Sequence, residues 1–482
     1  MADQIMWRWK LAALHVALDL SERTPQVRSR LAGFVDGQEQ TFWERTDRLE
    51  DFGLDVSADV QGRLRMPSAL SRAVEDTMGA ELRAESALWL RLEPPYGYLG
   101  AAPWEQLGER IRIPVIRVPD HLPVSVRLGR IHRIAVIVTQ PPRARWGAAH
   151  ARALAQALDQ CIPAVAIELF PDASTAVLLR DEPLPASVTL HDPARAPAHA
   201  VRITRGPRSV PGLRSLESDD DPRLLWMEWI TGELADRAVS AVHVAAVGIA
   251  SAERSMLAVA GHPGADAGDV RGSVDADDLW FMADMLGAST VSIAAPESRR
   301  VDVGARMVAD RLGQLRPGPT VFSSIRQDPD ATALADIHSF LASREERQLP
   351  SDPSWFGYLQ PEAIVDALDA PAAEPDAAGS EAPLLRAILL PGVPTTSASR
   401  MPQPLPPPST SLPEPAGSGS YEELVEVPRW AASASRFIET RQAEMISRAS
   451  SEETPASLAH ESATSQALAD IQSLVQQHLG GV

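Results

Sequence analysis

Short apolar runs alternate with amphipathic stretches through most of this chain. Near the N-terminus Leu14, Val16 and Leu18 alternate with less apolar neighbours, which is the period of a half-buried strand. Residues 22–66 show no clear period. After Pro67 apolar side chains recur about one helical turn apart, and this spacing predicts a helix with a single apolar stripe: Leu70, Val74, Met78 and Leu82.

From about residue 131 the pattern changes to continuous apolar runs, which are typical of parallel strands buried on both faces. Strands are predicted at five of these runs and at one earlier run: residues 87–92, 131–139, 164–170, 238–247, 289–295 and 320–324. Helices are predicted between and after them: residues 147–160, 223–236, 275–286, 302–315 and 330–343. This order predicts an α/β fold in which helices cover both faces of a mainly parallel central sheet.

These patterns divide the chain into four parts. We expect an N-terminal element with one strand at 1–66, an α/β domain at 67–360, a flexible linker rich in Pro, Ala and Ser at 361–428, and amphipathic C-terminal helices at 429–482. The linker accounts for many of the 41 prolines, which fit neither helices nor sheets.

Two apolar stripes mark the C-terminal segment, and each needs a surface to cover. The candidate partner-binding residues on these stripes are Trp430, Phe437, Ile438, Leu468, Ile471 and Val475. The stripes either pack on the chain itself or dock on another protein, and the sequence leaves both alternatives open.

Charge and cysteine content narrow the classes of partner. The formal net charge is -19 and no basic stripe interrupts it, so we expect no nucleic-acid binding. Cys161 is the single cysteine, and the 11 histidines show no metal-site spacing, so no metal or cofactor is expected. No apolar stretch reaches the roughly 20 residues of a membrane helix. We therefore expect no membrane partner and a cytoplasmic location.

Several consecutive segments resemble the CHAT family of caspase-like cysteine proteases. Residues 103–107 read PWEQL where the family has LPWELL, residues 242–248 read VHVAAVG against VHFAGHG, and residues 291–298 read VSIAAPES against VVLNACES. The likeness spans roughly residues 68–360, and its specificity comes from the order and spacing of the motifs. The resemblance implies a caspase-like three-layer sandwich.

The family's mechanism depends on two residues that this chain lacks. A cysteine thiolate attacks the scissile carbonyl and a histidine handles the protons, so both lie at the carboxyl ends of neighbouring parallel strands. Val247 stands at the family's histidine position, and Pro296 stands at its cysteine position. We therefore expect no catalytic residue, and a vestigial cleft formed by His243, Gly248, Ala295, Glu297 and Ser298.

Other residues could in principle replace the missing pair. The competing hypothesis is an active peptidase with a non-standard nucleophile, such as Ser298 with His262 as its base. His243 falls inside a strand, so we expect it to be a buried, hydrogen-bonded histidine of the core. Cys161 falls at the end of a helix, away from the cleft, and is expected to be a small buried residue.

The resemblance and the missing dyad together imply a pseudoprotease that binds proteins instead of cutting them. We expect a regulatory or scaffold subunit that holds a protein partner or a peptide segment. Such a subunit would act in a hetero-complex with an active protease or another component of a bacterial system.

Overall fold

The fold was described from a computed structural model of the chain. The structure describes residues 12–359, with gaps at 20–24, 36–37, 55–63, 81–86, 94–95, 112, 120–130, 142–143, 181–182, 198–221, 236, 251–254, 265–270, 297–302, 317, 344–348 and 350–351. The expected linker at 361–428 and the expected C-terminal helices at 429–482 therefore lie outside the described residues.

Strands dominate the first third of the described chain and then alternate with helices. The strands are β1 (Ala12–Asp19), β2 (Gln26–Val35), β3 (Gln38–Arg48), β4 (Leu88–Glu93), β5 (Val115–Arg117), β6 (His132–Val138), β7 (Val165–Pro171), β8 (Val188–Leu190), β9 (Ala241–Ala245), β10 (Val247–Ala250), β11 (Ser255–Ala260), β12 (Arg271–Val274), β13 (Thr290–Ala295), β14 (Thr320–Ser324) and β15 (Trp355–Tyr358). The helices are α2 (Ser68–Ala80), α3 (Gln106–Ile111), α4 (Trp146–Cys161), α5 (Ala173–Leu179), α6 (Pro222–Leu234), α7 (Ala276–Met285), α8 (Val303–Leu315) and α9 (Thr332–Ala342). Short 3-10 helices are η2 (Leu49–Phe52), η3 (Gly97–Ala101) and η4 (Pro193–Arg195).

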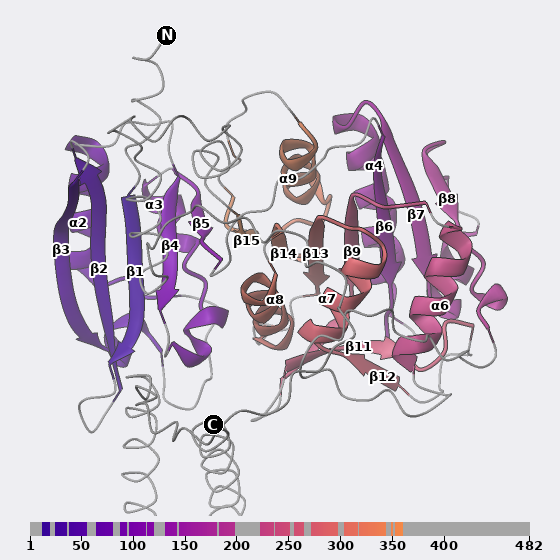
Figure 1. Cartoon of the computed structure of the whole chain (residues 1–482), viewed down its shortest axis with the longest axis horizontal. Coiled ribbons are helices and arrows are strands. Elements are labelled where there is room, and N and C mark those ends of the chain that lie inside the picture. Colours follow the sequence, from indigo (N-terminus) through magenta and orange to yellow (C-terminus); the bar gives the residue numbers. More distant parts are fainter. Residues whose placement is uncertain are drawn as a thin grey trace, which may run out of the picture.

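Most of these strands belong to one continuous sheet. The 12-stranded sheet has the order β3-β2-β1-β4-β5-β15-β14-β13-β9-β6-β7-β8, and a 3-stranded sheet has the order β10-β11-β12. Neighbours in the large sheet run parallel except for the antiparallel pairs β1–β2, β2–β3 and β14–β15. We call β1–β5 the N-terminal half-sheet and β6–β9 with β13–β15 the C-terminal half-sheet (Figure 1).

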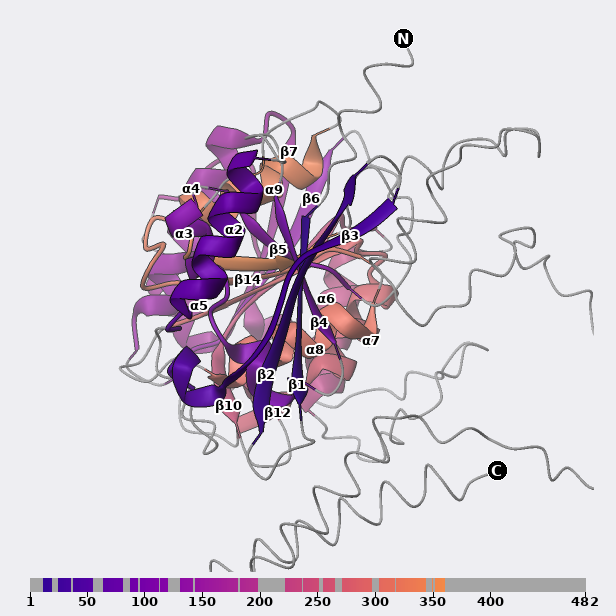
Figure 2. The same cartoon turned by 90° about the vertical axis from the view of Figure 1, so that its left-hand side faces the viewer.

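The C-terminal half-sheet is buried on both faces, as its continuous apolar runs predict. Helices α4, α5 and α9 pack on one face, and α6, α7 and α8 pack on the other (Figure 2). Because successive side chains of a strand point to opposite faces, Ala241 and Ala245 of β9 meet the first layer, while Val242 and Val244 meet the second. The chain is thus an α/β protein with a large, mixed, mostly parallel sheet flanked by helices.

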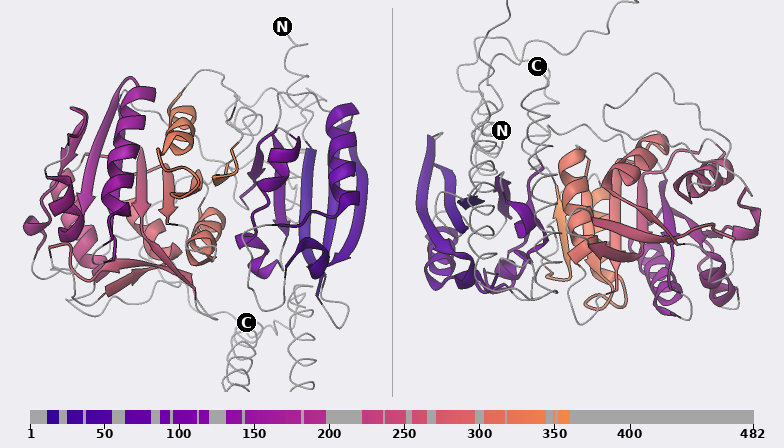
Figure 3. Two further views of the ribbon diagram at one scale, coloured as in Figure 1. Left: turned by 180° about the vertical axis from the view of Figure 1, so that it is seen from behind. Right: turned by 90° about the horizontal axis from the view of Figure 1, so that it is seen from below.

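The N-terminal half-sheet has a core of its own on one face. Leu14 and Val16 of β1 pack there with Leu90 of β4, Leu70 of α2 and Leu107 of α3. The other face carries the intervening side chains of the same strands, several of which are charged. Strand β15 is the member of the C-terminal half-sheet that pairs with β5, and it is seen from behind at the boundary between the two half-sheets (Figure 3).

The small sheet β10–β12 follows directly on β9 and lies along the lower edge of the C-terminal half-sheet (Figure 1). Helix α8 packs closely against it at Gly304, where an added Cβ atom would lie 2.5 Å from the backbone of Ile249. Only glycine fits at that approach, because real Cβ atoms essentially never come so near backbone.

Several sequence expectations are confirmed and some are wrong. All seven predicted strands and all six predicted helices are present, with bounds that shift by a few residues. The N-terminal element was expected to hold one strand, but it holds three, and β1 joins it to the large sheet by pairing with β4. The strand predicted at 238–247 ends at Ala245, and Val247 already begins β10.

Candidate functional site

Two neighbouring parallel strands bring Val247 and Pro296 to the same edge of the sheet. Strands β9 and β13 pair in register, from Ala241 opposite Thr290 to Ala245 opposite Ala294. Each pair is separated by 49 positions in the sequence, and the same offset relates 247 to 296. The sequence positions that correspond to the family's dyad therefore follow the carboxyl ends of adjacent strands. Both residues are partly exposed, as is Gly248, whereas Ala295 is buried.

Polar side chains near this edge accept hydrogen bonds from backbone N–H groups. Thr139, just after β6, accepts a hydrogen bond from the backbone N–H of Ala260 through its hydroxyl at 3.0 Å. Asp172, just after β7, accepts from the N–H of Gln140 at 2.9 Å and caps α5 by accepting from the N–H of Thr175 at 2.7 Å. These groups hold the loops at the carboxyl edge. Ser324, which stands opposite Ala295 and therefore next to Pro296, is buried.

His262 lies in the turn after β11, and both of its ring nitrogens are used by the backbone. Its Nε2 donates to the carbonyl of Pro197 at 2.9 Å, and its Nδ1 accepts from the N–H of Gly264 at 2.9 Å. Such an imidazole cannot act as a base without breaking one of these bonds. Glu297 and Ser298, the other members of the expected cleft, lie outside the described residues, so the pairing of Ser298 with His262 stays a prediction.

A chain of buried histidines crosses the core below this edge. Nε2 of His150 on α4 lies 3.1 Å from Nε2 of His243 on β9, and Nδ1 of His243 lies 2.8 Å from the hydroxyl of Ser292 on β13. The same hydroxyl lies 3.0 Å from Nε2 of His338 on α9. We call these four residues the histidine chain. His243 is thus a buried, hydrogen-bonded core residue, as expected.

The hydrogen bonds of the histidine chain can be satisfied in two ways. Either Ser292 donates to His338 and accepts from His243, or it donates to His243 and accepts from His338. Each arrangement places one N–H on an end nitrogen, Nδ1 of His338 or Nδ1 of His150, and neither nitrogen has a partner among the described residues. The arrangement thus contains a hydroxyl between two imidazoles, which is a pattern that nucleophilic enzymes use.

Burial decides against catalysis by this hydroxyl. Ser292, His243 and His338 are each 0% exposed, so no substrate carbonyl can reach the oxygen. Burial also lowers the pKa of His150 to about 4 and that of His338 to about 3. Burial, reinforced by the neighbouring imidazoles, holds the pKa of His243 well below its ordinary value. The histidine chain is therefore uncharged at neutral pH and ties α4, β9, β13 and α9 together.

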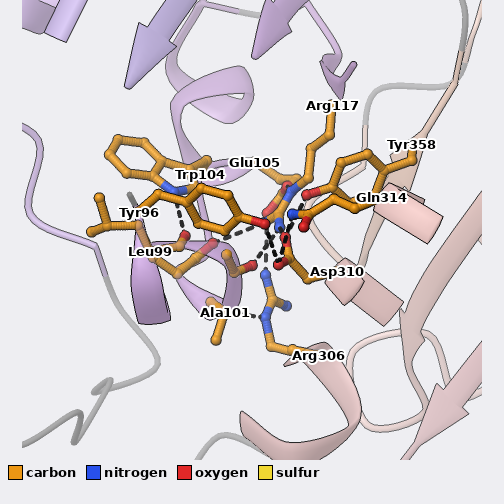
Figure 4. Close-up of polar contacts among 12 residues, drawn as sticks. Tyr96, Leu99, Ala101, Trp104, Glu105, Arg117, Arg306, Asp310, Gln314 and Tyr358 are labelled. Carbon is orange, nitrogen blue, oxygen red and sulfur yellow. Dashed lines mark hydrogen bonds and ion pairs between the residues drawn. The ribbon is translucent and has the colours of Figure 1, made fainter. Parts of the chain in front are cut away.

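A second polar cluster joins the two half-sheets around Arg117, at the end of β5 (Figure 4). The Arg117 side chain is 0% exposed, and its Nε donates to Glu105 at 2.9 Å while Nη2 donates to the carbonyl of Ala102 at 2.9 Å. Its Nη1 donates to the carbonyl of Gly100 and to Asp310 of α8, the latter at 3.3 Å. Its guanidinium carbon lies 3.9 Å from the ring centre of Phe356 in β15.

Asp310 and Arg306 complete this cluster from α8. Arg306 donates to the carbonyl of Ala101 at 2.8 Å and to Glu105 at 3.2 Å. Asp310 accepts from the hydroxyl of Tyr358 and, at 3.4 Å, from that of Tyr96. Burial raises the pKa of Asp310, although Arg117 opposes that rise. Two arginines thus face two carboxylates in a buried, hydrogen-bonded group, and its geometry is that of a structural clamp.

The Arg117 cluster borders a hollow at the carboxyl edge of the sheet. The hollow has a volume of about 230 Å³ and is lined by Glu105, Gly108, Glu109, Pro114, Val115, Asp352, Pro353 and Trp355. Trp355 pairs with Ser323 near the carboxyl end of β14, so the hollow opens on the same edge as Val247 and Pro296. Three of the lining side chains are acidic.

The structure tests the expectation for Cys161 but not that for the C-terminal candidate residues. Cys161 ends α4 and is partly exposed, so the expectation of a buried residue is wrong. Its sulfur lies 3.4 Å from the carbonyl oxygen of Ala335 on α9, at the end of the sheet opposite to the dyad positions. The six candidate partner-binding residues between Trp430 and Val475 lie outside the described residues.

His150, His338 and Arg117 were not singled out from the sequence. His150 and His338 are each an isolated polar residue on a helix. His243, the partner of His150, lies 93 positions away, and Ser292, the partner of His338, lies 46 positions away, so no local spacing reveals either contact. Arg117 was hidden for the same reason, because Asp310 is 193 positions away. The segment 103–107, which contains Glu105, was the one available signal.

Within the described ranges, no group of three or more His, Cys, Asp or Glu side chains is arranged to hold a metal ion. None of the helices described is both long enough and apolar enough to cross a membrane. No known protein family, no curated protein and no solved structure matches this chain.

Proposed function

We propose that this chain is a catalytically inactive, CHAT-like pseudoprotease with a caspase-like three-layer body, which works as a protein-binding subunit. The observation that carries this proposal is the pairing of β9 and β13, which ends at Ala245 opposite Ala294. Val247 and Pro296 each follow two residues after that last pair. In the family's mechanism a histidine and a cysteine stand at these ends of adjacent parallel strands. A valine has no proton to transfer, and a proline has no nucleophile.

The surroundings of the two positions support binding in place of catalysis. The hydroxyl of Thr139 and the carboxylate of Asp172 accept hydrogen bonds from backbone N–H groups. Both ring nitrogens of the nearby His262 are hydrogen-bonded to the backbone. The hydroxyl that does contact imidazoles, that of Ser292, is buried. The acidic hollow beside Trp355 opens on the same edge of the sheet.

A polypeptide that lies along this edge is the partner that we propose. The hollow beside Trp355 has a size that suits one long side chain, and Glu109 and Asp352 are exposed on its rim. Their charge favours an arginine or lysine of the bound segment. The segment belongs to a protein partner, which we take to be an active protease or another component of the same complex.

The dyad positions can be tested by restoring the missing groups. In a Cys161→Ser background, P296C alone and V247H/P296C should both bind a thiol-directed peptide probe. The double variant should react about tenfold faster near neutral pH, because an adjacent imidazole lowers the pKa of a thiol. Equal rates in the two variants would show that the positions are not neighbours and would overturn the assignment of the cleft.

The absence of catalysis is tested on the unaltered chain. Incubation with a mixture of peptides should give no cleavage above a buffer control. Cleavage that is abolished by S298A or H262A would establish the competing peptidase instead.

The binding role is tested separately at the acidic hollow. An arginine-bearing peptide should bind the full chain, and E109Q/D352N should weaken that binding about tenfold. Substitution of the peptide's arginine by alanine should have a similar effect. Peptide binding that is unchanged in both cases would remove the hollow from the proposed groove.

A further inference from the structure

The charged face of the N-terminal half-sheet holds a row of cationic side chains around one histidine. In the register of the strands, His15 of β1 stands directly opposite Arg30 of β2 and Arg91 of β4. Glu44 of β3 stands opposite Arg30 on the outer side. Because residues opposite one another project to the same face, the four side chains form a line across four strands.

A second pair of charges borders this row. Arg28 and Glu93 both stand opposite Ala17, one residue pair further along β1. Nη2 of Arg28 lies 3.7 Å from Glu93. Three arginines and two glutamates therefore leave this face locally positive, in a chain whose net charge is -19.

His15 is held in one orientation by Glu93. Its Nδ1 lies 2.8 Å from Oε1 of Glu93, and a carboxylate in that position accepts the Nδ1 proton. Burial alone would raise the pKa of Glu93, but the hydrogen bond from His15, together with the charges of His15, Arg30 and Arg91, leaves this pKa below its ordinary value. Burial, together with Arg30 and Arg91, lowers the pKa of His15. The neutral ring therefore has its proton on Nδ1 and a lone pair on Nε2.

That lone pair has no partner among the described residues, although His15 is only 2% exposed. A buried acceptor without a donor is unfavourable by about 1–3 kcal/mol. The same histidine lines a hollow of about 280 Å³, together with Arg28, Arg30, Glu44 and Glu93. This volume lies at the lower limit of small-molecule sites, which occupy about 300–1,000 Å³.

We propose that this hollow binds a phosphate group, either inorganic phosphate or the phosphate of a small metabolite. Arg28 and Arg30, the two arginines that line the hollow, supply N–H donors to the anionic oxygens, and Nε2 of His15 accepts the hydrogen of a protonated phosphate oxygen. The required ligand has both negative oxygens and one O–H group on the same small tetrahedral centre. Sulfate has the same shape and charge but carries no proton near neutral pH, so the site discriminates against it.

The test is titration calorimetry on the full chain at constant ionic strength, near pH 6. Inorganic phosphate should bind saturably at millimolar or lower concentration, and sulfate should bind about tenfold more weakly or not at all. Binding of glycerol phosphate should weaken toward pH 8, because the second ionisation of a phosphate monoester, with a pKa of about 6, removes the only proton that Nε2 can accept. Inorganic phosphate keeps one O–H group after the same ionisation, so its binding should depend less on pH. A parallel titration with glycerol phosphate distinguishes the sources: tighter binding than inorganic phosphate indicates a metabolite, and weaker binding indicates the free ion.

Variants connect the binding to this face. R30Q, on a partly exposed strand position, should weaken phosphate binding about tenfold, whereas R72Q on the exposed side of α2 should leave it unchanged. H15Q should abolish the preference for phosphate over sulfate, and the thermal unfolding of R30Q and H15Q identifies any variant that fails to fold. Absence of saturable phosphate binding, equal binding of sulfate, or an unaltered affinity in folded R30Q would overturn the proposal.

Discussion

The hydroxyl of Ser292 lies 2.8 Å from Nδ1 of His243 at the centre of the core, where neither residue is exposed. The two residues come from neighbouring parallel strands and stand opposite each other in the register. A serine and a histidine in contact are usually examined as a catalytic pair. Here the contact serves as a cross-link between strands and extends to α4 and α9, which pack on the same face of the sheet.

Ser292→Ala tests that structural role. The substitution removes the partner of one nitrogen on His243 and of one on His338, and buried polar atoms without partners are unfavourable by about 1–3 kcal/mol. We expect the free energy of unfolding in urea to fall by that amount. Ser187→Ala is the matched control, because it removes a surface hydrogen bond to Asp159 and should change stability by less than about 0.5 kcal/mol. Equal effects of the two substitutions would contradict the role of the histidine chain.

Acid should destabilise the protein through the histidine chain. The unfolded chain takes up protons on its histidines below about pH 6.5. In the folded chain burial delays this uptake to about pH 4 at His150 and about pH 3 at His338. The unfolded state therefore binds more protons in this window, and stability that is fully present above about pH 6.5 is lost as the pH falls.

At about pH 5 the loss should be about 2 kcal/mol for each of these imidazoles. Asp278 acts in the opposite direction, since burial raises its pKa to about 6 and its protonation favours the folded state below that value. Urea unfolding at several pH values measures the net slope. His338→Gln should make the slope smaller, and a slope that this variant leaves unchanged would show that the acid sensitivity arises elsewhere.

Gly313→Ala should be strongly destabilising. An added Cβ atom at Gly313 on α8 would lie 2.3 Å from the ring of Tyr358. The hydroxyl of this tyrosine donates a hydrogen bond to Asp310, so the ring is held in place. Overpacking of this kind typically lowers stability by about 1–3 kcal/mol. Gly232→Ala on α6 is the control, because nothing lies within 4 Å of the added atom and alanine favours the helix by up to about 1 kcal/mol. Thermal unfolding should thus move in opposite directions for the two variants.

Arg117→Lys should show that the clamp between the half-sheets depends on the guanidinium. Lysine keeps the charge, but its single ammonium cannot reach Glu105, Asp310 and the backbone carbonyls together. Breaking a buried ion pair, which leaves a carboxylate without its partner, typically lowers stability by about 3–5 kcal/mol. Arg45→Lys, at an exposed arginine that pairs with the buried Asp47, keeps the charge and should lower it by less than about 0.5 kcal/mol. A loss at Arg117 as small as that at Arg45 would argue against the clamp.

The parallel part of the fold was predictable because its signals are local. Helix α4 was expected at 147–160 and occupies Trp146–Cys161, since its apolar side chains recur at one-turn spacing over four turns. The strands β6, β9 and β13 were expected because each is a continuous apolar run.

The antiparallel part was harder to predict because its strands pair across long or polar segments. In β2 the apolar residues Val27 and Leu31 are separated by arginines and serine, and β15 has only four residues and pairs with distant β14. The positions of Val247 and Pro296 followed from motif spacing, while the histidine chain and the row around His15 depend on register. Register is a property of the assembled sheet, so no single segment encodes it.

Strands β5 and β15 share a single register pair, Arg117 opposite Tyr358, where every neighbouring strand of the C-terminal half-sheet shares several. Tension applied along the strand order would therefore concentrate at that single register pair. The two half-sheets should separate first there, and the separation would also divide the apolar cluster in which Trp89 and Ile116 pack with residues of α4 and α9. The buried Arg117 at this register pair also bonds Glu105 and Asp310, so it holds the two half-sheets together under load.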